Sequence, residues 1–341
     1  MLILTPRAAE GSKKCSVSST AVYSARYSGN RPREALAKYG EGWIAITARM
    51  ERGNGDLIDA PSNHFLMPTR NCSGHAPTKR LRACAEDQDF AAMIPCKIHF
   101  CYGFQGPEAP FYYAHYLAVK SAGQVNRPEE ISISIAHEPK GEWWNETRKI
   151  ANVITVDPPA EIFGRPLRHF AHQADVFRLR KLLSEGGIYL DIDTLCLKPF
   201  HDLLHHKMVM ARQSAKYGLC NAVMLAEPQS RFLNAWLHRY RTFRAEGRDH
   251  YWDEHSVRVP RRLSRRFWLW RHITILPHYT FFPVAWNDPQ GIFVRDDITP
   301  FERSYCVHLW ETDSLDFLRD LTPEKIARGS SAYCRLARQF A

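Results

Sequence analysis

From residue 97 onward, short apolar runs alternate with longer segments in which apolar side chains recur at helical spacing. The runs at residues 97–102, 131–135 and 153–156 are rich in β-branched and aromatic residues and predict strands. Residues 111–121 repeat aromatic and aliphatic side chains with the period of a helix. A rhythm of strand, helix and strand indicates a mostly parallel sheet with crossover helices. Ligands of such sheets bind beyond the carboxyl ends of the strands, so we expect a functional site at that edge.

The first 92 residues show a different pattern. They mix Ser, Gly, Arg, Ala and Pro without a sustained period, and no segment offers a face that a core could bury. We therefore expect residues 1–92 to be a disordered extension and residues 93–341 to form a single domain, with a natural start at Met93. An organelle transit peptide stays open as the alternative for this Arg- and Ser-rich beginning.

The composition is that of a globular chain, since 45% of its 341 residues are hydrophobic and 12% are aromatic. The formal net charge of +10 favours phosphorylated or polyanionic partners and anionic membrane surfaces. No apolar run reaches the roughly 18 residues of a membrane-spanning helix, and the apolar start at residues 1–4 is too short for a signal peptide. The nine cysteines lack CxxC spacing, which fits buried thiols in a reducing compartment. We expect a cytoplasmic protein that can contact the inner face of a membrane peripherally.

The most informative stretch is residues 186–193, with the sequence Gly-Gly-Ile-Tyr-Leu-Asp-Ile-Asp. The glycine pair predicts the end of a helix, and residues 189–193 have the composition of a buried strand. Because strand side chains alternate between faces, we expect Asp191 and Asp193 on one face and Ile192 in the core. Two neighbouring carboxylates repel each other unless a cation lies between them, and they suit Mg²⁺ or Mn²⁺ better than Zn²⁺. The alternative is a strand end with two solvated aspartates.

Residues 169–183, just upstream, have the length and the apolar period of a helix. His172, Asp175 and Arg178 are spaced three apart within it and are therefore neighbours on one helix face. A polar stripe among core residues is either a self-contained ion pair or part of a site. Spacing alone leaves both interpretations open for Asp175 and Arg178.

Residues 174–178 followed by residues 186–193 together resemble the signature of glycosyltransferases with a DxD sugar-binding region. That family includes the yeast-type initiating α-mannosyltransferases and the α-1,4-galactosyltransferases, with the clostridial glucosylating toxins as more distant relatives. The resemblance covers residues 94–311 and is most specific in its middle third. It implies a GT-A-like, Rossmann-related α/β fold, in which a mostly parallel sheet flanked by helices forms a single catalytic domain.

The resemblance also implies an activity, the metal-dependent and retaining transfer of a hexose from a UDP- or GDP-sugar to a glycan or lipid-linked acceptor. In that activity Asp193 and His308 would bind Mn²⁺ or Mg²⁺, while Asp191 would bind the donor through its ribose or sugar and share the metal through water. Without the resemblance, a lone histidine between apolar residues is more often a satisfied core group. Asp175 and Arg178 would hold hydroxyls of the donor sugar and complete the catalytic set with the two aspartates.

Two more residues are donor-binding candidates by resemblance. Tyr102 ends the first predicted strand, where the family has an aromatic residue that stacks on the nucleotide base, and the alternative is a tyrosine at the edge of the core. Asn221 matches an asparagine whose amide approaches the donor sugar or the acceptor, and the alternative is a turn asparagine.

Glu254, His255 and Trp310 are the acceptor-side candidates. Many relatives carry Gly-Pro near residues 252–257 and this chain does not, so a solvated turn stays open for Glu254 and His255. Trp310 closes the string Cys-Val-His-Leu-Trp at residues 306–310, which matches a late motif of the family.

Residues 258–271 interleave arginines with Leu, Phe and Trp. This pattern fits an interfacial helix on an anionic membrane. The alternative is a surface helix whose aromatic residues pack inward. No recognised nucleic-acid module accompanies the segment, so we expect no nucleic acid partner.

Two other functions stay open from the sequence. The protein could hydrolyse the nucleotide sugar or transfer a nucleotidyl group, although residues 102–106 lack the lysine of a Gly-rich phosphate loop. It could also be a non-catalytic sugar-binding module. Loss of either Asp191 or Asp193 would favour that function, and both are present.

Overall fold

The computed structural model describes residues 93–341 and six strands within residues 1–92, and the chain divides into two compact units, Met1–Gln88 and Asp89–Ala341. In the first unit β1 to β5 pair in sequence and β6 pairs with β4, all antiparallel. These strands are β1 Leu4–Pro6, β2 Thr20–Ala25, β3 Pro32–Gly40, β4 Trp43–Glu51, β5 Leu57–Asp59 and β6 Phe65–Pro68. The hypothesis of a disordered extension stays a prediction, and resistance of residues 20–80 to limited proteolysis would contradict it.

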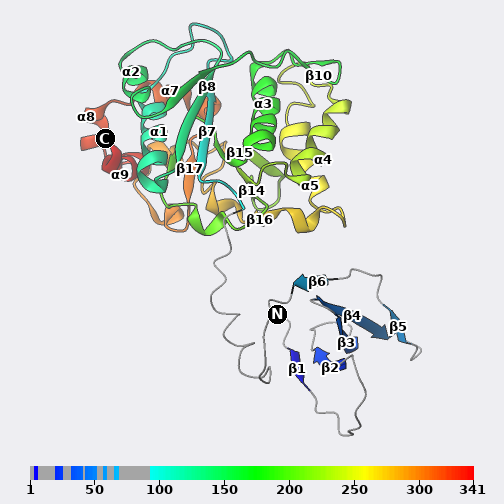
Figure 1. Ribbon diagram of the computed structural model, residues 1–341. Coiled ribbons are helices and arrows are strands. Elements are labelled where there is room, and N and C mark those ends of the chain that lie inside the picture. Colours follow the sequence, from blue (N-terminus) through cyan, green and yellow to red (C-terminus); the bar gives the residue numbers. More distant parts are fainter. Residues whose placement is uncertain are drawn as a thin grey trace, which may run out of the picture. The chain divides into compact units, whose positions relative to one another are not determined.

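The second unit is built on a seven-stranded sheet with the order β16-β14-β15-β12-β7-β8-β9 (Figure 1). Within this sheet only β15 runs against the others, because it pairs antiparallel with β12 and β14 while the remaining pairs are parallel. The predicted mostly parallel sheet is therefore confirmed. Its strands are β7 Lys97–Tyr102, β8 Glu130–Ile135, β9 Asn152–Thr155, β12 Gly187–Leu190, β14 Met208–Arg212, β15 Leu219–Ala226 and β16 Thr274–Leu276.

Two small antiparallel sheets and nine α-helices complete this unit within residues 93–341. The sheets pair β10 Glu161–Ile162 with β11 Arg165–Pro166, and β13 Thr194–Cys196 with β17 Cys306–His308. The helices are α1 Tyr113–Asn126, α2 Glu142–Thr147, α3 Phe170–Glu185, α4 Arg231–Arg239, α5 Val259–Leu263, α6 Gln290–Phe293, α7 Glu311–Arg319, α8 Pro323–Arg328 and α9 Ala332–Ala337. None of the helices in the described part of the chain is long and apolar enough to cross a membrane.

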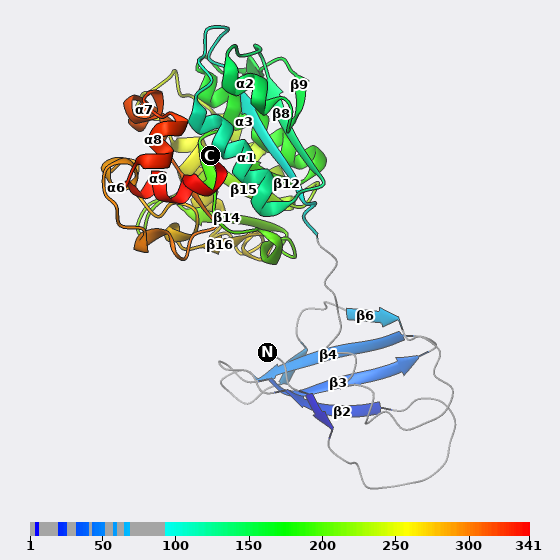
Figure 2. The same cartoon turned by 90° about the vertical axis from the view of Figure 1, so that its left-hand side faces the viewer.

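The large sheet separates two hydrophobic cores, because its side chains alternate between the two faces. On β12, Ile188 and Leu190 belong to one core and Tyr189 belongs to the other. Helices α1, α8 and α9 cover the first core, and α3, α4 and α5 cover the second (Figures 1 and 2). The sheet is thus the middle layer of the α/β fold.

The connection from α3 to β12 depends on its two glycines. Gly186 and Gly187 have φ angles of +67° and +100°, a region that glycine adopts readily. A Cβ atom on Gly187 would lie 2.7 Å from the carbonyl oxygen of Lys97, across the parallel pairing of β12 with β7. The predicted end of the helix at the glycine pair is confirmed.

The strand predicted through Asp193 ends earlier. β12 stops at Leu190, and the chain then turns, with the Thr194 amide donating to the carbonyl of Asp191 at 3.0 Å. β13 leaves the large sheet and pairs with β17 instead. The prediction that strand alternation places both aspartates on one face is therefore wrong, because a turn brings them together. Ile192 between them is buried, as predicted.

Candidate active site

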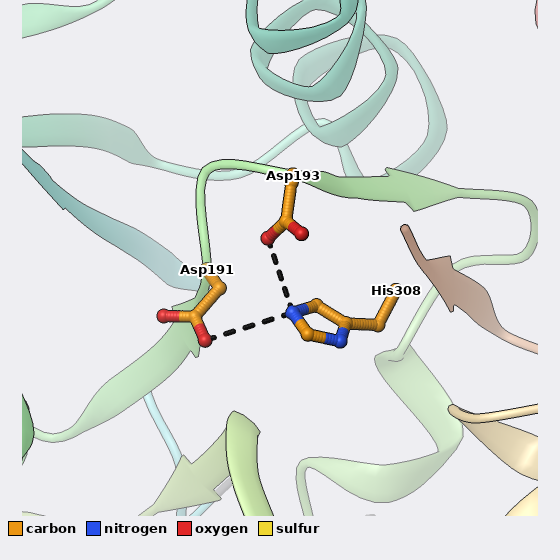
Figure 3. A group of neighbouring side chains, drawn as sticks. All are labelled: Asp191, Asp193 and His308. Carbon is orange, nitrogen blue, oxygen red and sulfur yellow. Dashed lines mark ion pairs between the residues drawn. The ribbon is translucent and has the colours of Figure 1, made fainter. Parts of the chain in front are cut away.

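Three side chains meet beyond the carboxyl end of β12, with both carboxylates directed at one nitrogen of the imidazole (Figure 3). Asp191 follows β12, Asp193 precedes β13, and the pairing of β13 with β17 sets His308 opposite Thr194. The His308 Nε2 atom lies 3.1 Å from an Asp193 oxygen and 3.7 Å from an Asp191 oxygen. A short antiparallel pair thus joins parts of the chain that are far apart in sequence.

These residues have the arrangement of a metal site. Each offers one ligand atom, and the three atoms all lie within 4.8 Å of one another. Asp193 and His308 are buried, so the alternative of two solvated aspartates does not hold. The second oxygen of Asp193 accepts a hydrogen bond from the Glu311 amide at 2.8 Å, which fixes the orientation of the carboxylate. Two carboxylates and one imidazole fit Mn²⁺, and the carboxylate oxygens also suit Mg²⁺.

The pKa values of these groups favour positive charge at the point where they meet. Burial raises the pKa of Asp191, and Arg178 and His308 offset only part of that effect. Burial acts in the same sense on Asp193, but the charge and hydrogen bond of His308 outweigh it and lower the pKa of that carboxyl. For His308, burial opposes the charged form, yet the neighbouring Asp193 raises the pKa of the imidazole above its ordinary value. A cation at this point would take the place of that positive charge.

Arg178 on α3 holds Asp191 in place. Its Nη1 atom is 3.0 Å from an Asp191 oxygen and donates to the carbonyl of Asn221 at 2.9 Å. Its Nε atom donates to the carbonyl of Ala174 at 3.2 Å, and the guanidinium lies 4.6 Å from the ring centroid of Tyr189. The buried guanidinium therefore binds its neighbours through Nε and Nη1 and helps to orient Asp191. Its predicted contact with the donor sugar stays a prediction.

Asp175 and Asn221 are brought together from α3 and β15. The Asn221 side-chain amide donates to an Asp175 oxygen at 2.7 Å, and Arg178 Nη2 lies 3.7 Å from the same oxygen. The polar stripe of α3 is thus not a self-contained ion pair. It is one end of a network that continues through Arg178 to Asp191.

This network opens into a cavity of about 820 Å³, which is large enough for a nucleotide-sized ligand. The predicted site residues that line it come from β7, α3, the turn after β12, β15, β17 and the position just before α7. They are Tyr102, Asp175, Arg178, Asp191, Asp193, Asn221, His308 and Trp310.

Tyr102 and Trp310 reach the cavity, but both rings are largely covered. Tyr102 packs against the rings of Phe111 and His115, with centroids 5.2 and 5.3 Å away, and its predicted stacking on a base stays a prediction. The Trp310 ring lies 4.5 Å from that of His308. The backbone of Trp310 is left-handed, with φ of +57°, and this local strain directs the following amide toward the metal site.

Glu254 and His255 do not line the cavity. They lie on a π-helical turn, Glu254–Arg258, which presents Ser256 to the cavity and turns these two side chains toward α4. Glu254 accepts two hydrogen bonds from Arg244, at 2.9 and 3.0 Å, and the His255 Nε2 atom lies 3.1 Å from the carbonyl oxygen of Arg239. The structure therefore does not bring either residue to the predicted acceptor side.

Several cavity residues were not selected from the sequence. Trp252 and Trp286 add aromatic surface, and Arg248 and Asp313 add charge. His172, noticed only as part of the polar stripe, also lines the wall. Their residue types are ordinary in loops and helices, so nothing in the sequence alone distinguishes them from surface positions.

Two family models match this chain. Residues 114–210 match the model described as a glycosyltransferase sugar-binding region containing a DXD motif, and residues 259–340 match the α-1,4-glycosyltransferase conserved region. The first span includes α3, Asp191 and Asp193, and the second includes His308 and Trp310. The residues that meet in space are thus divided between the two matched spans.

The chain is also similar to individual proteins of known sequence or structure. The chain is 34% identical over 267 residues to glucan organizing enzyme 1 of Cryptococcus neoformans. The matched region covers 73% of this chain and 71% of that protein. It is 29% identical over 180 residues to the lactosylceramide 4-alpha-galactosyltransferase of Mus musculus, of whose length it spans 47%. Among solved structures, the glycosyltransferase GlyE of Streptococcus pneumoniae TIGR4 is 14% identical with a TM-score of 0.40, covering 72% of this chain and 60% of that one.

Proposed function

Because the chain belongs to the glycosyltransferases with a DXD-containing sugar-binding region, we propose that it transfers a hexose from a nucleotide-sugar donor to a glycan or glycolipid acceptor, with retention and with a divalent cation. One observation carries the proposal. The ligand atoms of Asp191, Asp193 and His308 lie within 4.8 Å of one another beside a cavity of about 820 Å³.

Asp191, Asp193 and His308 would hold the cation, for which Mn²⁺ or Mg²⁺ is the candidate. A bound cation would neutralise the negative charge that develops on the diphosphate leaving group. The chain prepares this site in advance. Arg178 orients Asp191, and the Glu311 amide orients Asp193, so little rearrangement is needed when the ligand arrives.

Asp175 and Asn221, which both line the cavity, would contact the hexose. A carboxylate accepts several hydrogen bonds, so Asp175 can bind sugar hydroxyls while it keeps the bond from Asn221. Its engagement with that amide and with Arg178 favours an orienting role over that of a nucleophile. Transfer on the same face of the sugar, driven by stabilisation of the leaving group, needs no enzyme nucleophile and gives retention.

The acceptor and the location complete the proposal. Trp252, Trp286 and Trp310 line the cavity and suit the apolar faces of sugar rings, in keeping with a glycan or glycolipid acceptor.

We propose a cytoplasmic protein in peripheral contact with the inner face of a membrane. Cell fractionation tests the location, and recovery from the lumen of an organelle would contradict it.

The decisive experiment titrates the full chain with Mn²⁺ and with UDP-galactose, UDP-glucose, UDP-N-acetylhexosamine and GDP-mannose. Binding heat and release of nucleoside diphosphate are followed. We expect one donor to bind only with the metal and to release its diphosphate. The Asp193→Asn variant should lose both signals, whereas Asp316→Asn, whose side chain is 99% exposed, should keep them.

The remaining outcomes distinguish the alternative functions. A folded protein that binds no nucleotide sugar with Mn²⁺ present would overturn the proposal. Free hexose as the sole sugar product, even with glycan acceptors added, would identify a hydrolase. Release of a sugar 1-phosphate would identify nucleotidyl transfer, and tight binding without turnover would identify a sugar-binding module.

A further inference from the structure

The segment after α5 turns its aromatic residues toward solvent. Phe267 is 85% exposed, Trp268 57% and Trp270 50%, while Leu269 among them is 2% exposed. The alternative of inward-packed aromatic residues therefore does not hold for these three rings. The exposed residues of the segment, which we call the aromatic–basic face, are Arg265, Arg266, Phe267, Trp268, Trp270 and Arg271.

The predicted single helix over residues 258–271 is wrong, which explains this exposure. α5 covers only Val259–Leu263, and the chain then continues in turns, with a short 3-10 turn at Trp270–His272. Without a continuous helix, the apolar side chains have no common face to bury. Leu269 alone of the residues from 265 to 271 enters the core beneath α4 and α5.

A pocket of about 290 Å³ lies beside the aromatic–basic face, where α4, the π-helical turn and α5 meet. Figure 1 shows α4 and α5 next to each other on the same side of the sheet. We call this the arginine pocket. It is lined by Arg239, Thr242, Glu254, Val259, Arg262, Leu263 and Arg266. Because Arg266 belongs to both features, the pocket and the face are continuous.

Arginines outnumber carboxylates in the arginine pocket. Its one carboxylate, Glu254, is bound by Arg244 through two hydrogen bonds and lies 3.5 Å from Arg262. These contacts lower the pKa of Glu254, with the Arg244 hydrogen bond as the largest cause, and keep it charged. Within residues 93–341, Arg239 and Arg266 form no ion pair. Two guanidinium groups are thus available for an external anion.

We propose that the aromatic–basic face docks this protein on an anionic lipid surface, with a lipid phosphate seated in the arginine pocket. Tryptophan and phenylalanine favour the interface of a bilayer, and arginines beside them favour anionic headgroups. Guanidinium groups also bind phosphate through paired hydrogen bonds. A free phosphate would occupy the arginines and leave the three rings in water, whereas a lipid surface accounts for both features. The inference rests on the membrane contact of the proposed function and not on the transfer reaction.

The test is co-sedimentation of the full chain with vesicles of phosphatidylcholine alone and of phosphatidylcholine with phosphatidylserine. We expect binding to the anionic vesicles and much weaker binding to the neutral ones. The pair Phe267→Ser with Trp268→Ser and the pair Arg239→Gln with Arg266→Gln should each weaken binding at least about tenfold. Val294→Ser and Arg328→Gln, two exposed positions just after α6 and at the end of α8, should leave binding unchanged.

Several results would overturn the inference. Equal binding to both vesicle types would show that the anionic headgroup is not recognised. Unchanged vesicle binding by the variant with Arg239→Gln and Arg266→Gln would show that the arginine pocket takes no part. Binding of inorganic phosphate without vesicle binding would show an anion site alone. A shift in oligomeric state on gel filtration of the Phe267 and Trp268 variants, without vesicle binding, would show a contact between copies. Since no donor is present, failure of the transfer reaction leaves this test unaffected, and each variant is checked for folding by its cooperative urea unfolding.

Discussion

Two segments of this chain, helix α3 and the stretch at and after α5, carry polar residues at helical spacing, and they differ completely in their surroundings. On α3, Asp175 and Arg178 are buried and bound to Asp191 and Asn221. At and after α5, arginines spaced in the same way remain exposed, and Arg266 has no carboxylate partner within residues 93–341. Spacing alone did not distinguish the two. Neighbouring elements did, because the turn after β12 and strand β15 provide partners for the first, whereas in the second only Arg262 lies near a described carboxylate, Glu254 at 3.5 Å.

The difference has an energetic cause. Burying a guanidinium costs several kcal/mol unless its hydrogen bonds are replaced, so Arg178 is tolerated only where carbonyls and a carboxylate surround it. Exposed arginines carry no such cost and remain free to bind an external partner. The buried polar network of α3 therefore orients the side chains of the proposed metal site, whereas the exposed arginines after α5 remain available for an external partner.

The largest expected effect comes from exchanging one arginine in each region. Arg178→Ala should lower the free energy of unfolding by about 3–5 kcal/mol, because it removes the buried partner of the Asp175 and Asp191 carboxylates, of which Asp175 is buried and Asp191 half-buried. Arg265→Ala, in the exposed region, should change it by less than about 0.5 kcal/mol. Urea unfolding of both variants measures these free energies. Equal losses of stability would show that the two regions do not differ energetically.

Metal binding should stabilise the protein through the buried network and not through the exposed arginines. At a Mn²⁺ concentration a hundredfold above its dissociation constant, the native state should gain about 2.7 kcal/mol. Thermal unfolding with Mn²⁺ or with EDTA measures the gain. It should vanish in Asp193→Asn and persist in Arg266→Gln. Persistence in the aspartate variant would place the ion elsewhere.

A third comparison lies within the segment after α5. Leu269→Ala should destabilise the protein by about 2 kcal/mol, since its side chain is the buried one there. Trp268→Ala should cost less than about 0.5 kcal/mol despite removing a larger side chain. The denaturant midpoints of the two variants measure these changes in stability. A larger loss of stability for Trp268→Ala would show that the tryptophan ring is packed.

The smallest effect concerns the hydrogen bond that ends the α3 network. Asn221→Ala should cost about 1–2 kcal/mol, because a buried carboxylate loses its 2.7 Å partner. The control is Asn145→Ala on the exposed side of α2, which should be close to neutral. An Asn221 variant as stable as the control would mean that Arg178 alone satisfies Asp175.

The strongest sequence predictions concerned residues close together in the chain. The glycine pair correctly marked the end of α3, and β7 has the bounds predicted from its apolar run. The pairing of Asp191 with Asp193 was found from the motif, although through a wrong local structure. Glu254 and His255 were acceptor-side candidates from the sequence, with a solvated turn as the alternative. A π-helical turn, which has no simple sequence signal, directs them elsewhere.

The sequence by itself determined the local features: the strand and helix periods, the glycine turn, the acidic pair and the family signature that includes them. These follow from chemistry within a few residues, where side-chain spacing and backbone preference act directly. Only the tertiary structure decided which distant groups meet. His308 reaches the aspartates through the pairing of β13 with β17, Asn221 reaches Asp175 through the sheet, and the aromatic rings after α5 face outward because no element covers them within the described residues. Such contacts depend on the packing of whole layers, which no short stretch of sequence encodes alone.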